Sequence, residues 1–136
     1  MARSVAKDLQ TALFLPKIKP YADALAAELS EWEKTTNHLL GIAAKGDAEV
    51  FLSDATLYIE LFGILNVAWQ WLRMGTVAEK LLLENSADAD QAFYTSKIHT
   101  MQFFFHYELP KVKSLTTRLL DETVLTVFDE KVEILM

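Results

Sequence analysis

The sequence predicts an all-α fold: an antiparallel, up-and-down bundle of three to four long helices. Apolar residues recur at steps of three and four over most of the chain, which is the period of a helix with one buried face. The 136 residues include only four glycines and three prolines, too few for a fold rich in turns. Two short polar corners divide the apolar pattern, and corners of that length make neighbouring helices antiparallel.

The N-terminal segment holds a few apolar residues before it reaches Pro16 and Pro20. Proline cannot donate a backbone hydrogen bond and clashes with the preceding turn, so it ends a helix that reaches it. We therefore expect residues 1–19 to form a short helix or linker. Residues 20–136 are expected to form a single helical-bundle domain.

The first long helix is predicted to begin near Tyr21 and to end before Gly46. Gly46 can adopt the left-handed conformation that ends a helix, and the side chain of Asp47 can cap the start of the next one. The apolar face of this first helix consists of Tyr21, Leu25, Leu29, Trp32, Thr36, Leu39 and Ala43.

The second helix is predicted to run without interruption from Ala48 into the low eighties, at the centre of the bundle. A helix with so wide an apolar surface must be covered by neighbours on most sides. The ionisable Glu60 inside it argues against a transmembrane segment, and we expect Glu60 to be solvated or ion-paired rather than a catalytic base. Its polar or small residues form one narrow stripe: Thr56, Glu60, Gly63, Asn66, Gln70 and Arg73.

The third helix follows a corner at residues 85–90, where Asp88 and Gln91 fit a capping box. Pro110 predicts a kink or a break between two helices. Beyond it we expect a frayed helical tail, because a strand at residues 124–128 would have no sheet to join. The predicted buried face consists of Tyr94, Ile98, Met101, Phe105, Leu109, Val112, Leu115 and Leu119.

Charge and composition argue against several classes of function. The formal net charge is −6, so the chain is not expected to bind nucleic acid or an anionic membrane surface. It has no cysteine, which excludes disulfides, thiolate metal sites and cysteine nucleophiles. The N-terminus lacks the apolar core of a secretory signal, and we expect a cytoplasmic location without membrane association.

No catalytic, cofactor-binding or metal-ligating residue can be assigned from the sequence. None of the three histidines follows a glutamate by three positions, as a di-iron bundle requires, although His99 and His106 lie near one face. The nucleophile elbow of serine hydrolases and the glycine-rich loops that bind phosphates are both missing.

Surplus aromatic residues instead predict a surface for a partner. Consecutive residues on a helix point about 100° apart, so three adjacent phenylalanines cannot all line one pocket. Exposed aromatic clusters usually mark contacts with other proteins. The candidate interface residues are Trp69, Trp71, Phe103, Phe104 and Phe105.

Two aromatic blocks also carry a family resemblance. The first contains Tyr58, Leu61, Phe62 and Gly63, followed by Trp69, Trp71, Leu72, Arg73 and Met74; the second contains Phe93, Tyr94, Lys97, Phe103, Phe104, Leu109 and Pro110. This order resembles the C-terminal helical extension of the acyl-CoA dehydrogenases, in the branch of larger enzymes that act on long-chain or methylthio-substituted acyl-CoA. Asn66 and Val67 depart from the small residues of that pattern, and Gln102 replaces an expected arginine.

The resemblance implies one part of a larger enzyme. In that family an upstream core holds FAD and acyl-CoA and supplies the carboxylate that removes the α-proton, so the parent would be an acyl-CoA dehydrogenase that performs α,β-desaturation. This chain would hold no cofactor and would pack on the core domain of the same polypeptide, with a structural role in a homo-oligomer. The residues alone leave two alternatives: a free-standing helical module that forms homodimers, and a small-ligand carrier with an apolar cavity.

Overall fold

The structure is a computed structural model that describes residues 2–84 and 87–127. These residues form six helices and no strand, which confirms the predicted all-α bundle. Three helices are long and three are short. The helices are α1 (Ala2–Leu13), α2 (Lys19–Ala44), α3 (Ala48–Ser53), α4 (Ala55–Leu83), α5 (Asp88–Tyr107) and α6 (Lys111–Leu120).

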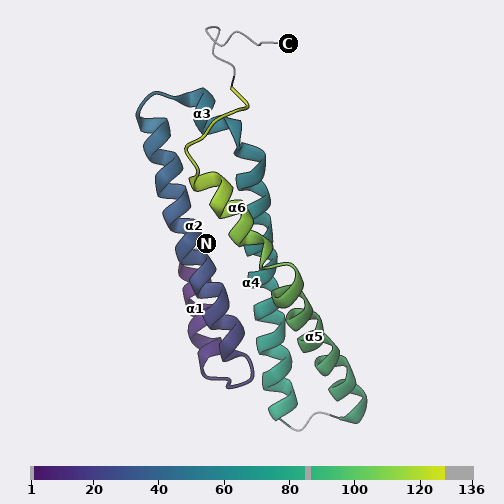
Figure 1. The fold of residues 1–136 in the computed structure, drawn as a ribbon. Coiled ribbons are helices and arrows are strands. Elements are labelled where there is room, and N and C mark those ends of the chain that lie inside the picture. Colours follow the sequence, from purple (N-terminus) through teal and green to yellow (C-terminus); the bar gives the residue numbers. More distant parts are fainter. Residues whose placement is uncertain (1, 85–86, 128–136) are drawn as a thin grey trace, which may run out of the picture.

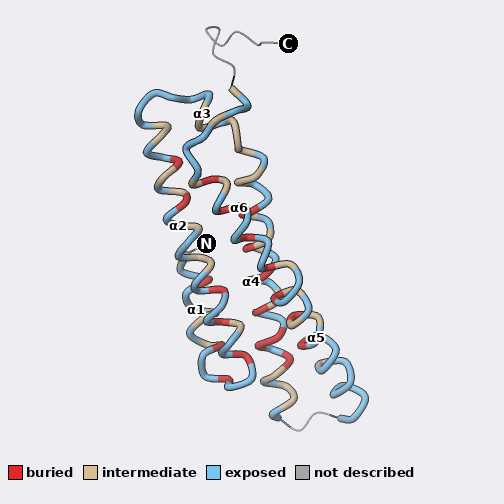
Figure 2. Tube along the Cα trace, in the orientation of Figure 1, coloured by how far each residue is buried: buried red, intermediate tan, exposed pale blue. Residues whose placement is uncertain are grey.

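Helix α4 lies at the centre of the bundle, as the sequence predicts, and contacts α1, α2, α5 and α6. Figure 1 shows α2 and α4 running antiparallel, with α5 folded back along the second half of α4 and α6 beside its first half. Buried residues gather where these helices face one another (Figure 2). The centre of this core on α4 consists of Leu61, Leu65, Ala68 and Leu72.

The N-terminal segment forms a helix that packs on the bundle. Helix α1 contacts both α2 and α4. The carboxylate of Asp8 accepts a hydrogen bond from Trp69 Nε1 at 2.8 Å and lies 3.3 Å from Arg73 Nε. Helix α2 then begins at Lys19, with Pro20 in its first turn, where a proline costs no helical hydrogen bond.

The corner after α2 is formed by Gly46 and Asp47, as the sequence predicts. Gly46 has a φ of 82°, in the left-handed region that glycine adopts most readily. Asp47 precedes α3, and its side chain accepts a hydrogen bond from Val50 N at 3.4 Å. Both residues therefore act as the sequence predicts.

The predicted continuous second helix is wrong, because Asp54 separates α3 from α4. Its φ of −110° and ψ of 20° interrupt the helical path. The Asp54 carboxylate accepts hydrogen bonds from Nε and Nη2 of Arg118 at 3.2 and 3.1 Å. Apolar periodicity does not reveal a bond between residues 64 positions apart. It therefore did not predict the break at Asp54.

The sequence predicted a kink or a break at Pro110, and the structure has a break there. Helix α5 ends at Tyr107, and α6 begins at Lys111. The backbone N–H groups of Glu108 and Leu109 both donate to Phe104 O, at 2.9 and 3.0 Å. The predicted apolar face of this segment is the face that packs on the core.

Two smaller predictions for this segment are wrong. Ala87, in place of Asp88, holds the N-cap position of α5, and Asp88 lies in the first turn, where its charge favours the helix dipole. Residues 121–127 are not helical, because Asp121 Oδ1 accepts from Thr123 N at 2.9 Å and Arg118 donates to Thr123 O. The remainder of the predicted tail lies outside the described residues.

The link between Asp54 and Arg118 gives a first prediction. Replacing Arg118 with alanine should lower the free energy of unfolding by about 1–2 kcal/mol, because the half-buried carboxylate loses its donors. Lys111→Ala is the control, since its pair with Glu108 is exposed and should be worth at most about 0.5 kcal/mol. Urea unfolding measures both. Equal losses would show that the Asp54 link does not hold α6 to the bundle.

Candidate interaction surface

The five aromatic residues predicted to form an interface do not share one face. Trp69 lies against α1 through its bond to Asp8. Trp71 points to another side of α4, since positions two apart differ by roughly 160° around a helix. Both tryptophans are partly buried against the core.

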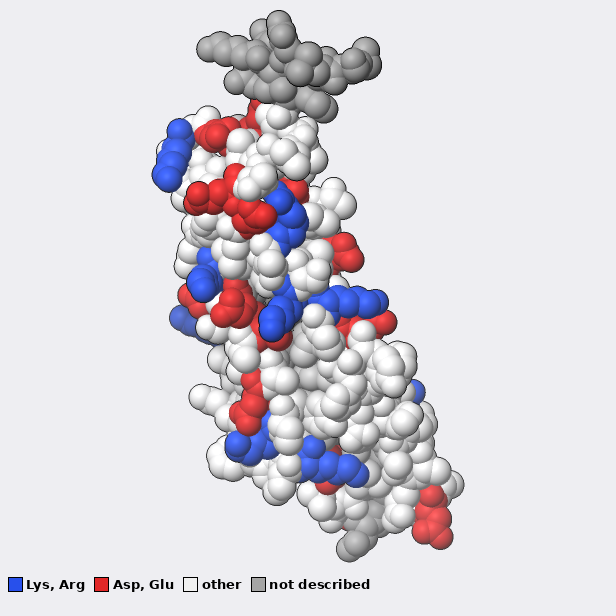
Figure 3. Space-filling view, viewed as in Figure 1, with Lys and Arg blue, Asp and Glu red and all other residues white. Residues whose placement is uncertain are grey.

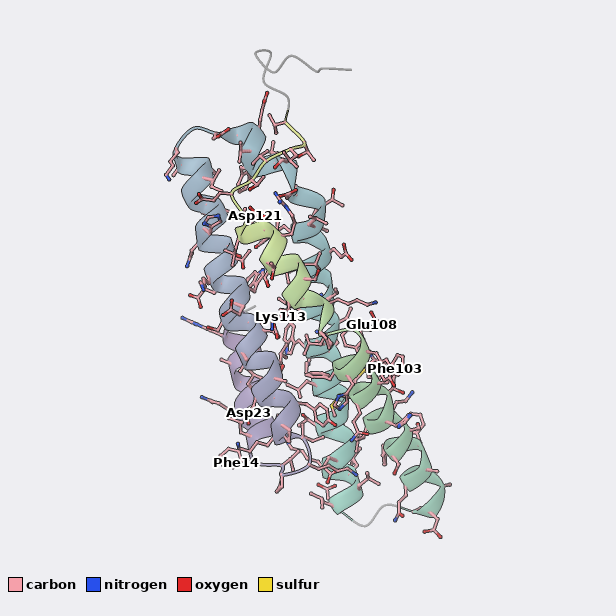
Figure 4. All side chains as sticks on the ribbon, in the orientation of Figure 1. Phe14, Asp23, Phe103, Glu108, Lys113 and Asp121 are labelled. Atoms are coloured by element: carbon pink, nitrogen blue, oxygen red, sulfur yellow. The ribbon has the colours of Figure 1, made fainter. Side chains whose placement is uncertain are left out.

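The three consecutive phenylalanines of α5 also diverge. Phe105 is buried and meets the ring of Tyr21 edge-on at 5.5 Å. Phe104 is partly buried, whereas Phe103 is 51% exposed. Phe103 stacks on Tyr107 with ring centroids 4.7 Å apart. Figure 4 shows Phe103 on the outer side of α5, away from α2.

An exposed apolar surface lies near the end of the α4–α5 hairpin. Its centre consists of Met74 and Val77 from α4 and Phe93 from α5, which are 43%, 56% and 56% exposed. We call these three residues the hairpin surface. They line a shallow hollow of ≈ 360 Å³. Lys97 lies at its edge, with its Nζ 4.9 Å from the centre of the Phe93 ring.

Two cations border this surface, because Arg73 of α4 and Lys97 of α5 line the same hollow. On the face drawn in Figure 3, few charged side chains lie over α5 and the adjoining part of α4, while charges gather over α2, α3 and α6. A contiguous apolar area of this kind is typical of a contact with another protein. None of the three residues of the hairpin surface was predicted as an interface residue, because a helix that is apolar on most sides does not show which side its neighbours leave open.

The other residues considered for catalysis or metal binding are Glu60, His99 and His106, and they are not assembled into a site. Glu60 is exposed on α4, as expected for a solvated residue. His99 and His106 are both exposed on α5. Within residues 2–84 and 87–127, no group of three or more histidine, cysteine, aspartate or glutamate side chains is placed to hold a metal ion. None of the described helices combines the length and apolar character needed to cross a membrane.

Glu28 on α2, near α6, has a raised pKa. Burial and the neighbouring charge of Glu31 raise the pKa of Glu28 above its usual value, and the charge of Lys113 partly offsets this rise. Figure 4 places Lys113 on the side of α6 that faces α2. The site is a helix contact, and burial in that contact is the main cause of the raised pKa.

The raised pKa of Glu28 predicts a pH dependence of stability. The folded state binds this proton more tightly than the unfolded state, so Glu28 favours folding at low pH, and this advantage is lost as the pH rises through the raised pKa. Glu28→Gln should therefore gain stability relative to the wild type as the pH rises above about 4.3. Thermal melts of both proteins at several pH values measure the difference. A difference in melting temperature independent of pH would contradict it.

The structure defines the class of protein as an all-α domain that exposes an apolar surface. Comparison with known families shows which family this domain belongs to. Residues 1–127 match the family described as acetyl-CoA dehydrogenase C-terminal like. Because the match spans most of the chain, this chain belongs to that family. No curated protein and no solved structure matches it. The resemblance carried by the two aromatic blocks is thereby confirmed at the level of the family.

Proposed function

We propose that this chain is the non-catalytic C-terminal helical domain of a flavin-dependent acyl-CoA dehydrogenase. The observation that carries the proposal is the family match over residues 1–127. The aromatic blocks favour the branch that acts on long-chain or methylthio-substituted acyl-CoA. In this proposal the parent enzyme acts in the cytoplasm and desaturates its substrate at the α,β bond. FAD and the catalytic carboxylate belong to the core.

The role of the domain itself is assembly. Its hairpin surface packs on the dehydrogenase core of the same polypeptide or on a neighbouring subunit of a homo-oligomer. Met74, Val77 and Phe93 are 43%, 56% and 56% exposed, so each has apolar area left to bury. Burying the exposed half of such a side chain is worth about half of the roughly 1.5–3 kcal/mol that complete burial gives, so all three would favour docking.

The same surface supports a second candidate, a free-standing module that forms homodimers. The two candidates differ in what the isolated chain does. A homodimer would show a sedimentation coefficient that rises with concentration, whereas a domain that needs the core should remain monomeric. A strict monomer at high concentration would exclude the second candidate.

The division of labour between domain and core can be tested directly. FAD and an acyl-CoA thioester are added to the isolated chain, and flavin absorbance is measured after unbound FAD has been removed. We expect no bound flavin and no desaturated product, because in this proposal the core supplies the flavin site and the catalytic carboxylate. Flavin that remains with the chain would contradict the proposal.

A further inference from the structure

Helix α1 covers only part of the groove between α2 and α4. It has 12 residues, whereas α2 has 26 and α4 has 29. Figure 1 shows α1 beside the first half of α2, with its N-terminal end directed toward the second half. The walls that α1 covers continue beyond this end toward α3, which packs on α2.

The two walls continue at helical spacing. On α4, Trp69 anchors α1, and the positions at steps of three and four before it are Asn66, Phe62 and Ile59. On α2, Leu29 lies against α1, and the following positions on the same side are Glu33, Thr36 and Leu40. Since residues at these steps share a helix face, both walls face the direction from which α1 packs.

Two hollows mark this path. The first, of ≈ 490 Å³, lies between the N-terminal half of α1 and α2 and is lined by Val5 and Leu29. The second, of ≈ 240 Å³, lies farther along between α2 and α4, and its lining includes Phe51 of α3 and Asp54. Thr36 and Leu40 of α2 and Tyr58 and Ile59 of α4 also line it, and we call these four residues the open groove.

The open groove can lose its water at little cost. Leu40 and Ile59 are 55% and 68% exposed, so they have much apolar area left to bury. The hydroxyl groups of Thr36 and Tyr58 are 2.8 Å apart and bond each other. A helix placed over them would therefore not leave these two hydroxyls without a partner.

Charge at the end of α1 favours one direction for a helix placed in this groove. The first turn of α1 contains no acidic residue and carries Arg3, an unfavourable charge for the start of a helix. The negative C-terminal end of an incoming helix would meet this arginine and the positive end of α1. The wall on α2 from Glu33 to Leu40 is about 10 Å long, or about two helical turns.

We propose that the open groove is the docking site for an apolar helix of the dehydrogenase core. That helix lies in line with α1, with its C-terminal end toward Arg3. It presents an apolar edge to Leu40 and Ile59, as α1 presents Val5 to its own part of the groove. This inference rests on the proposed function, since it names a second part of the domain, besides the hairpin surface, that contacts the core.

Single cysteines test the proposal, because the chain contains none of its own. Leu40→Cys and Ile59→Cys report on the open groove, and Val77→Cys reports on the hairpin surface. Ala27→Cys is the control, exposed on the opposite side of α2. All four positions are exposed, and a circular dichroism melt confirms that each variant folds. The rate of maleimide labelling is measured in the 136-residue chain alone and in the complete dehydrogenase, with each labelled site identified by peptide mass.

We expect both groove cysteines to react at least about tenfold more slowly in the complete dehydrogenase, and Ala27→Cys to be unchanged. Protection of Val77→Cys without protection of the groove would overturn this inference and leave the proposed function standing. No protection at any position would overturn both. Protection of Leu40→Cys in the chain alone, increasing with its concentration, would identify a second copy as the occupant and also overturn the inference.

Discussion

Replacing Leu72 with alanine should lower the free energy of unfolding by about 2–5 kcal/mol, the usual range for a leucine deleted from a core. Leu72 is fully buried on α4, the helix that contacts four others. The cavity left by the missing atoms would lie between these helices, where none of them can move inward freely. Denaturant unfolding followed by circular dichroism measures the loss.

Val77→Ala is the matched control for Leu72→Ala. Val77 lies on the same helix and is 56% exposed, so its truncation should change the free energy of unfolding by no more than about 0.5 kcal/mol. If both variants lost the same stability, α4 would not be the centre of the core. A clear loss at Leu72 alone would support the arrangement of the bundle.

Gly75→Leu should also destabilise the fold, by about 1–3 kcal/mol. Gly75 is buried on α4 against α5, and a Cβ there would overlap Met101 Sδ. Met101 is itself fully buried, so its side chain has no free space to enter. The gain of up to about 1 kcal/mol from removing a glycine from a helix is smaller than the expected cost of overpacking.

Gly63→Leu is the control, and its expected change in stability has the opposite sign. Gly63 is on the same helix, and a Cβ there would meet no atom within 4 Å. The substitution should therefore stabilise the protein by up to about 1 kcal/mol through helix propensity alone. A thermal melt of both variants shows the sign of each change, and destabilisation at Gly63 together with none at Gly75 would place the close contact elsewhere.

The contact at Gly75 also bears on function. It fixes the distance between α4 and α5 two residues before Val77, and Val77 and Phe93 line the same hollow from the two helices. Forcing the helices apart at Gly75 would separate the two halves of the hairpin surface. Gly75→Leu is therefore expected to weaken docking to the core as well as stability.

Local signals in the sequence predicted much of the fold. Gly46 and Asp47 form their corner through their own backbone and side chain, and Pro110 breaks its helix by its own ring. The break at Asp54 is different, since it depends on Arg118 from a distant helix. A pattern of apolar residues carries no information about such a bond.

The interaction surface was harder to predict than the fold. Aromatic content pointed to Phe103, which is exposed, but equally to Phe105, which packs on Tyr21. Periodicity identifies the sides of α4 that are apolar and does not identify which side remains bare after α1, α2, α5 and α6 have packed. Val77 and the open groove emerge only when these helices are placed.

The mass of the native protein tests the central claim most directly. An antibody raised against this chain is used to isolate the protein from its source, and its mass and flavin absorbance are measured. The proposed function predicts a polypeptide several times larger than 15.4 kDa that carries FAD and desaturates acyl-CoA. A flavin-free polypeptide of 15.4 kDa would contradict it and would favour the homodimerising module.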